Sequence, residues 1–102
     1  ATVTLAHSKT ENLAELTKIA DIIISAVGKA ELITAKHINP AKKTVVVDVG
    51  MNTLHDKLVG DVKFDEVKDI CGAITPVPGG VGPMTIASLL LNTLRATELR
   101  NP

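Results

Sequence analysis

The segment Asp21-Ile-Ile-Ile-Ser-Ala-Val27 decides the fold class. It is a nearly continuous apolar run, which is typical of a strand covered on both faces in a parallel sheet. Gly28 ends this run, and Thr44-Val-Val-Val-Asp-Val49 has the same character further along the chain. The two segments therefore predict two doubly buried strands.

Helical periodicity occupies the intervals between the strand-like runs. Asn12 is placed to cap a helix, and Glu15 completes a capping-box pair. Thr34 can start a short helix that stops at Asn39, because the residue before Pro40 avoids helical dihedral angles. The buried stripe of the first helix is expected to comprise Leu13, Leu16 and Ile19 or Ala20.

A long helix is expected from Pro83, since proline in the first turn lacks only an N–H that would be unpaired anyway. Strands that alternate with helices indicate an α/β fold, with a parallel sheet and helices on both faces. The expected strands are 1–6, 21–27, 44–49, 58–62 and 72–76, and the expected helices start at 12, 34, 65 and 83. The stripe of the last helix is Met84, Ala87, Leu90 or Leu91, and Leu94.

Composition excludes several classes of function. The 102 residues include 11 basic and 11 acidic ones, and Phe64 is the only aromatic residue, so nucleic-acid binding is not expected. No apolar run approaches the roughly 20 residues of a membrane span. Cys71 is the only cysteine, which favours a reducing compartment, the cytoplasm first and an organelle as the alternative. The three histidines lack ligand-like spacing, so no metal site is expected: His7, His37 and His55.

Sheets of this kind place ligands beyond the carboxyl ends of their strands. The segment after the last strand is Thr75-Pro-Val-Pro-Gly-Gly-Val-Gly-Pro-Met-Thr85. Proline stiffens this bend, glycine permits close approach of a ligand, and the following helix offers unpaired N–H groups. The bend is read either as a ligand-binding loop or as a rigid structural turn.

Pro76–Thr85 resembles the signature of the bifunctional methylenetetrahydrofolate dehydrogenase/cyclohydrolase family. The resemblance covers the whole chain, because four further strings occur in family order: 7–10, 21–28, 47–52 and 58–62. It implies a partial Rossmann-like dinucleotide-binding domain over residues 1–102, lacking the first strand and its Gly-rich turn. It also implies an enzyme that oxidises 5,10-methylenetetrahydrofolate with NADP and hydrolyses the methenyl product to 10-formyltetrahydrofolate.

The resemblance assigns roles to particular residues. On the folate side of the cleft it places Pro78, Gly79, Gly80, Val81 and Gly82. On the cofactor side it places Ser8, Gly28, Val49, Gly50, Met51 and Thr85. Thr85 is expected near the nicotinamide, and Met51 stands where the family usually has isoleucine.

Ser8 bears on the choice of cofactor. The end of the second strand of a dinucleotide-binding fold commonly carries an acid that bonds the ribose 2′-hydroxyl. Here the matching segment His7–Thr10 has a hydroxyl and a cation, and no carboxylate precedes Glu11. This favours NADP over NAD. The alternative is a solvated turn with a helix cap, and for Lys9 that alternative is preferred.

Two residues within apolar surroundings are expected to be structural. Asp48 lies inside a predicted buried strand, where a carboxylate is costly unless it is bonded, so nearby backbone N–H groups should satisfy it. Cys71 is expected to fill the core rather than act as a nucleophile, because no histidine partner is indicated.

No catalytic residue is expected in this chain. The family's catalytic lysine and tyrosine belong to an N-terminal catalytic domain, and the chain contains no tyrosine. The isolated chain should therefore be inactive, with weak cofactor binding and an exposed sheet edge. The expected partners are tetrahydrofolate, the N-terminal domain and a second copy in a homodimer. Two alternatives stay open: a non-catalytic binding or dimerisation module, and another Rossmann-type dehydrogenase whose Pro/Gly bend is only structural.

Overall fold

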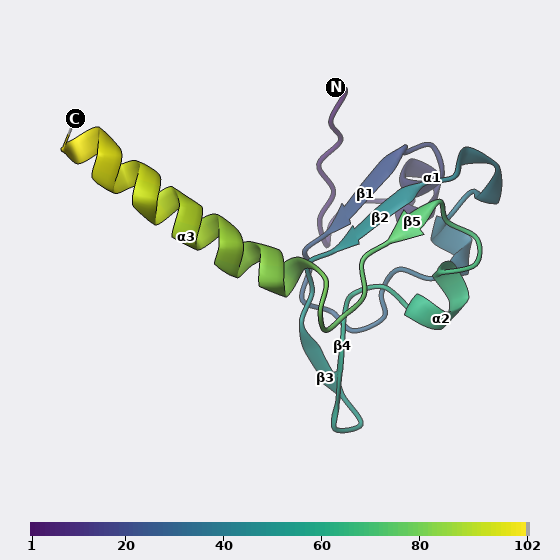
Figure 1. Ribbon diagram of the computed structural model, residues 1–102. Helices are drawn as coiled ribbons and strands as arrows, with labels where there is room; N and C mark the ends of the chain where they lie inside the picture. The colour runs from purple at the N-terminus through teal and green to yellow at the C-terminus, as the bar shows by residue number, and fades with distance from the viewer. Residues whose placement is uncertain (102) are drawn as a thin grey trace.

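The computed structural model describes residues 1–101. Its centre is a parallel sheet with the order β1 (Ile22–Ser25), β2 (Val45–Asp48) and β5 (Ala73–Ile74). An antiparallel hairpin, β3 (Asn52–Leu54) and β4 (Lys57–Val59), follows β2 at the carboxyl edge of the sheet (Figure 1). The predicted parallel α/β sheet is confirmed.

The short helices pack on one face of this sheet. They are α1 (Leu13–Lys18), the 3₁₀ helices η1 (Ala35–His37) and η2 (Pro40–Lys42), and α2 (Phe64–Val67). Because strand side chains alternate between faces, β1 and β2 each send every second residue into the core. The buried apolar residues are Ile23, Ile33, Ile38, Val46, Val62 and Val67.

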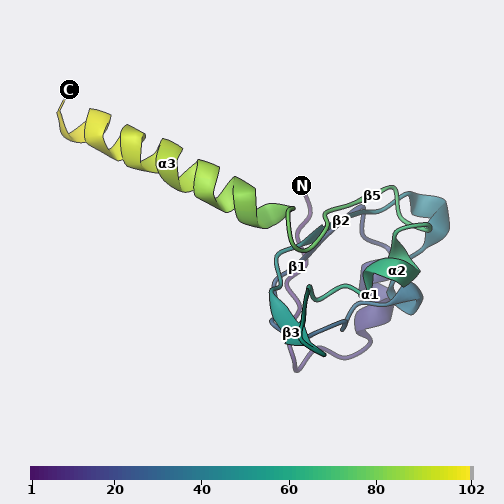
Figure 2. The same ribbon diagram turned by 60° about the horizontal axis from the view of Figure 1, so that its bottom comes forward.

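The opposite face of the sheet is open. Ile22 and Ile24 of β1 are 61% and 68% exposed, and Val45 of β2 is 40% exposed. The prediction that both strands are doubly buried is therefore wrong for this chain, as is the prediction of helices on both faces. The physical reason is that the last helix, which could cover this face, extends away from it (Figures 1 and 2).

This last helix, α3 (Val81–Arg100), has no buried residue. It begins two positions before the predicted start, since Pro83 is tolerated in the first turn where N–H groups have no helical partner. Its predicted buried stripe is exposed throughout, with Met84 at 63% and Leu94 at 57%. The projecting helix raises the radius of gyration to 15.9 Å, against about 13 Å for a compact chain of this length.

The N-terminal segment, residues 1–6, is not a strand. It runs beside β1 in the same direction (Figure 1), is exposed and makes no backbone hydrogen bond within residues 1–101. β-Branched residues favour an extended backbone, but a strand also needs a partner for its N–H and C=O groups. The predicted strand over 1–6 is wrong for that reason.

Two predicted details of the helices differ from the structure. Asn12 precedes α1 but adopts a left-handed conformation with φ 55°, and its side chain makes no capping bond. A capping box is found instead at η1, between Thr34 and His37. The predicted loop after Met51 is a hairpin, whose turn residues His55 and Asp56 both have positive φ, as a type I′ turn requires.

Candidate functional site at the carboxyl edge of the sheet

Three loops meet at the carboxyl edge of the sheet because β1, β2 and β5 run parallel (Figure 1). They are residues 26–29, 49–52 and 75–80. The third loop is tied to β2 by a hydrogen bond of 2.8 Å from the Asp48 N–H to the Thr75 hydroxyl. The structure thus brings together the regions of Gly28, Gly50 and the Pro/Gly bend.

Asp61 connects the first two loops. It is fully buried, and its carboxylate accepts hydrogen bonds from the three backbone N–H groups of residues 27–29, at 2.7–3.3 Å. The Ser25 hydroxyl and the Asn52 side-chain amide complete the shell at 3.2 and 3.0 Å. Successive N–H groups around a residue of positive φ, here Gly28 at 76°, form a pocket that fits an anion.

Hydrogen bonding keeps this carboxylate ionised. Burial alone would raise the pKa of Asp61, but hydrogen bonds led by those from Val27 and Asn52 outweigh burial and hold the pKa below its ordinary value. The turn after β1 therefore encloses a permanent internal anion at neutral pH.

Asp48 connects β2 with the segment after the hairpin. Its Oδ1 accepts the N–H groups of Gly50 and Asp61, and its Oδ2 accepts that of Val62, each at 3.0 Å. Asp48 is 3% exposed. The prediction that backbone N–H groups satisfy this aspartate is confirmed.

Glycines make room for the two carboxylates. A Cβ atom at Gly60 would overlap the Asp48 carboxylate, and a Cβ at Gly50 would overlap that of Asp61. The two aspartates and two glycines therefore interlock, and this fixes the path of the 49–52 loop.

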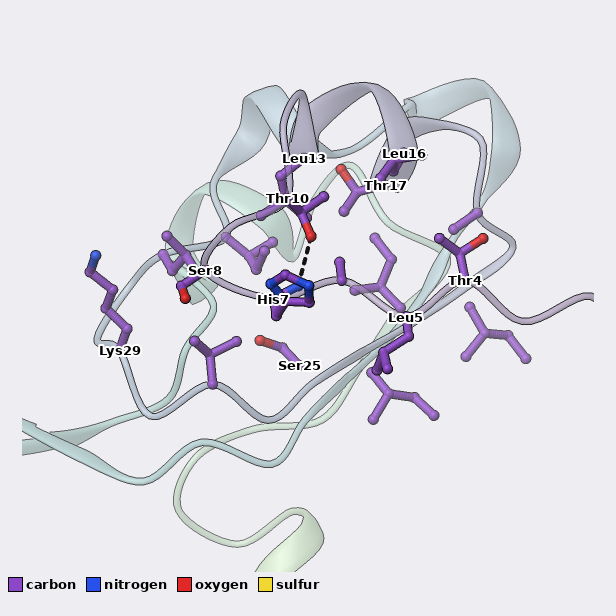
Figure 3. Close-up of a pocket in the computed structure, with 18 residues that line it drawn as sticks. Thr4, Leu5, His7, Ser8, Thr10, Leu13, Leu16, Thr17, Ser25 and Lys29 are labelled. Atoms are coloured by element: carbon purple, nitrogen blue, oxygen red, sulfur yellow. Dashed lines mark hydrogen bonds between the residues drawn. The ribbon is translucent and has the colours of Figure 1, made fainter.

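An open groove of about 390 Å³ lies between the N-terminal segment, α1 and β1. Figure 3 shows Ser8, His7 and Lys29 around one end of it, where the His7 N–H donates to the Thr10 hydroxyl at 2.8 Å. Ser8 is exposed at this end. No Asp or Glu is among the residues that line the groove, so its lining carries no negative charge.

The other predicted site residues lie near the third loop. Pro78 and Gly79 belong to an exposed turn, whereas Val81 and Gly82 already form the first turn of α3. Thr85 lies one turn further, and its hydroxyl donates to the Val81 carbonyl at 3.1 Å. Val49 and Met51 are 41% and 63% exposed beside the buried Gly50. The predicted residues thus lie near one edge of the sheet, with Ser8 at the end of the groove where Lys29 of the 26–29 loop also lies.

Asp61 and Asn52 were not predicted as site residues, although the sequence carried a signal for Asp61. Asp61 stands within Leu58-Val59-Gly60-Asp61-Val62, a carboxylate among apolar residues. The argument applied to Asp48 applies there equally. Asn52 and Thr75 carry no comparable signal, because their partners lie in other parts of the sequence.

The remaining chemistry-bearing residues lie apart from this edge. Cys71 is partly buried against the core, and burial raises the pKa of its thiol. Within residues 1–101 no group of three or more His, Cys, Asp or Glu side chains is arranged to hold a metal ion. No helix in the same range combines the length and apolarity needed to cross a membrane.

Comparison with known proteins agrees with this geometry. Residues 1–101 match the profile of the family described as tetrahydrofolate dehydrogenase/cyclohydrolase, NAD(P)-binding domain. Proteins named bifunctional protein FolD are 61% identical over 100 residues in Rhodopirellula baltica and 67% identical over 93 residues in Methanospirillum hungatei. These alignments cover 98% and 91% of this chain. The chain spans about a third of the length of either relative, 33% in both cases.

Solved structures show the same fold. The FolD methylenetetrahydrofolate dehydrogenase/cyclohydrolase of Campylobacter jejuni is 48% identical with a TM-score of 0.92, over 98% of this chain and 35% of that one. The Trypanosoma brucei enzyme, complexed with NADP and an inhibitor, is 42% identical with a TM-score of 0.84, over 92% of this chain and 34% of that one. The chain therefore belongs to the tetrahydrofolate dehydrogenase/cyclohydrolase family and corresponds to its NAD(P)-binding domain.

Proposed function

We propose that this chain is the NADP-binding part of an enzyme that oxidises 5,10-methylenetetrahydrofolate and hydrolyses the methenyl product to 10-formyltetrahydrofolate. The observation that carries the proposal is the meeting of three loops, with their family motifs, at the carboxyl edge of one parallel sheet. This edge is where open α/β sheets bind their ligands.

The groove beside β1 supports NADP rather than NAD. A 2′-phosphate carries negative charge, and an acid at this position would repel it. The groove instead has the Ser8 hydroxyl and Lys29 at one end and no carboxylate in its lining. The NADP complex of the Trypanosoma brucei relative is consistent with this choice.

We assign the two ligands to neighbouring loops. Gly28, Gly50 and the exposed Val49 and Met51 would face the dinucleotide, with Thr85 beside the nicotinamide. The nicotinamide accepts the hydride when the cofactor is bound. Pro78, Gly79 and Gly80, with Val81 and Gly82 of the first turn of α3, would face the folate. The chain's own task is then to hold the two reactants in contact and to exclude water between them.

Catalysis also requires a general acid or base, which we place in a separate N-terminal catalytic domain. The further partners that we propose are tetrahydrofolate and a second copy of the chain, and we propose the cytoplasm as the compartment. The exposed apolar face of the sheet at Ile22 and Ile24 favours the second copy of the chain as the partner that covers it.

The test compares the isolated 102-residue chain with the full-length product of the gene that encodes it. We expect the full-length product to reduce NADP with methylenetetrahydrofolate and to hydrolyse the methenyl compound. The isolated chain should show neither activity and should bind NADP more weakly than micromolar. A full-length product without dehydrogenase activity contradicts the proposal. Turnover by the isolated chain contradicts the placement of the acid or base elsewhere.

A second candidate is a non-catalytic dimerisation module with the same fold. The exposed apolar residues of the open sheet face and of α3 are the observation in its favour. Analytical ultracentrifugation together with NADP titration separates the two candidates. A full-length dimer that binds no NADP supports the module, whereas NADP binding with turnover supports the enzyme.

A further inference from the structure

The turn after β1 is stabilised by a carboxylate of the same chain, that of Asp61. The N–H groups of Val27, Gly28 and Lys29 all point to the Asp61 carboxylate, at 2.7, 3.3 and 3.0 Å. A backbone pocket of this shape would otherwise attract a phosphate. Because these three N–H groups are already used, the backbone of residues 27–29 can offer a ligand only its carbonyls and the bare Cα of Gly28.

The same carboxylate reaches the second loop. Asp61 Oδ1, which accepts the Lys29 N–H, also accepts the Asn52 side-chain amide at 3.0 Å. The backbone N–H of Asp61 is in turn fixed by Asp48 at 3.0 Å. One side chain therefore sets the spacing between the 26–29 turn and the 49–52 loop.

We propose that Asp61 is a positioning residue for the cofactor: it fills the N–H pocket after β1 and thereby holds Gly28 and the 49–52 loop in the arrangement that receives the dinucleotide. The inference rests on the proposed function, because it takes both loops to contact NADP. It adds that the phosphates are held outside this turn, since the Asp61 carboxylate already occupies the N–H pocket of residues 27–29.

The substitution Asp61→Asn tests the inference because it preserves side-chain volume. Both Asp61 oxygens accept N–H donors, so whichever position the new NH₂ group takes, it faces donors and at least two hydrogen bonds are lost. In the full-length gene product we expect the KM for NADP to rise about 10- to 100-fold, as small displacements of binding groups do. The KM for methylenetetrahydrofolate should change less than about threefold, a minor change on the scale of such displacements.

Val67→Ala is the matched control, because Val67 is fully buried but lies in α2, outside both loops. It should lower the free energy of unfolding and leave the KM for NADP unchanged. A residue that matters only for stability reduces the folded fraction, and hence the maximal rate, without moving that KM. Equal rises of the KM in both variants, or an unchanged KM in Asp61→Asn, overturn the inference.

If Asp61→Asn does not fold, the variants Ser25→Ala and Asn52→Ser test the inference in its place. Each removes one donor to the carboxylate and leaves the charge in place. We expect both to raise the KM for NADP, and Asn52→Ser to raise it more because its bond is shorter, 3.0 against 3.2 Å. An unchanged KM in both contradicts the inference. If the wild-type protein is inactive with NADP, both the proposed function and this inference are contradicted. If the wild type is active and the variants leave the KM for NADP unchanged, only this inference is contradicted.

Discussion

The body of the molecule and α3 use apolar residues in opposite ways. In residues 12–75, six apolar side chains are buried to 8% exposure or less, whereas the large apolar residues of α3 from Met84 to Leu99 are 57–80% exposed. Both regions contain apolar patterns from which burial is predicted: continuous runs in the strands of the body and a helical stripe in α3. An apolar pattern therefore identifies residues that can be buried, but burial itself needs an opposing surface.

The two regions also differ in the interactions that stabilise them. The body depends on contacts between distant residues, such as the hydrogen bonds of Asp61 to residues 27–29. α3 depends on its own backbone hydrogen bonds and on local bonds such as that from the Thr93 hydroxyl to the Leu89 carbonyl at 2.7 Å. Substitutions in the two regions should therefore have very different effects on stability.

The largest effect is expected from Asp48→Ala. It leaves the buried N–H groups of Gly50, Asp61 and Val62 without an acceptor, and we expect a loss of about 3–5 kcal/mol in the free energy of unfolding. Urea denaturation followed by circular dichroism measures it. Asp65→Ala removes an exposed acid at 4.0 Å from Lys68 and should change nothing measurable. A loss below about 1 kcal/mol for Asp48→Ala would show that the network does not stabilise the body.

Val46→Ala should have the next largest effect. Val46 is fully buried, and removing two methyl groups from the core costs about 2–3 kcal/mol through lost transfer energy and the cavity. The adjacent Val45 is 40% exposed on the open face and provides a matched control. Equal losses for the two alanine variants would mean that the open face is covered in solution.

A smaller effect is expected from the pH dependence of His37. Burial, followed by the nearby Lys36, lowers the pKa of His37 below its ordinary value of 6.5. The unfolded chain therefore takes up a proton that the folded chain does not, so stability should fall as pH drops below about 6.5 and be fully present above it. In His37→Gln this slope should disappear, and in the control His55→Gln, in the exposed hairpin turn, it should persist.

The smallest effect is expected from Leu90→Ala in α3. Leu90 is 68% exposed, and alanine is the stronger helix former, so the free energy of unfolding should change by less than about 0.5 kcal/mol. Thermal denaturation of the isolated chain measures it. A loss above about 1 kcal/mol would show that α3 packs against another surface in solution.

Much of the fold could be predicted from local sequence. The apolar runs at 21–27 and 44–49 contain β1 and β2, and the Pro/Gly bend precedes α3 as predicted. The prediction for residues 1–6 was wrong because strand formation depends on a partner, not on the β-branched residues alone. At the site, Asp48 was predicted correctly because a carboxylate inside an apolar strand must be hydrogen-bonded, although its partners Asp61 and Val62 lie 13 and 14 residues away.

Local sequence was enough to locate β1, β2 and α3, to supply the motifs that identify the family, and to establish the absence of tyrosine and of a second cysteine. Only the tertiary structure decided which apolar residues are buried and that Asp61, 34 residues from Val27, closes the turn after β1. The physical reason is that helix and strand propensities act between near neighbours. The burial of side chains, and the hydrogen bonds from backbone N–H groups to buried carboxylates, depend on distant segments that folding brings together.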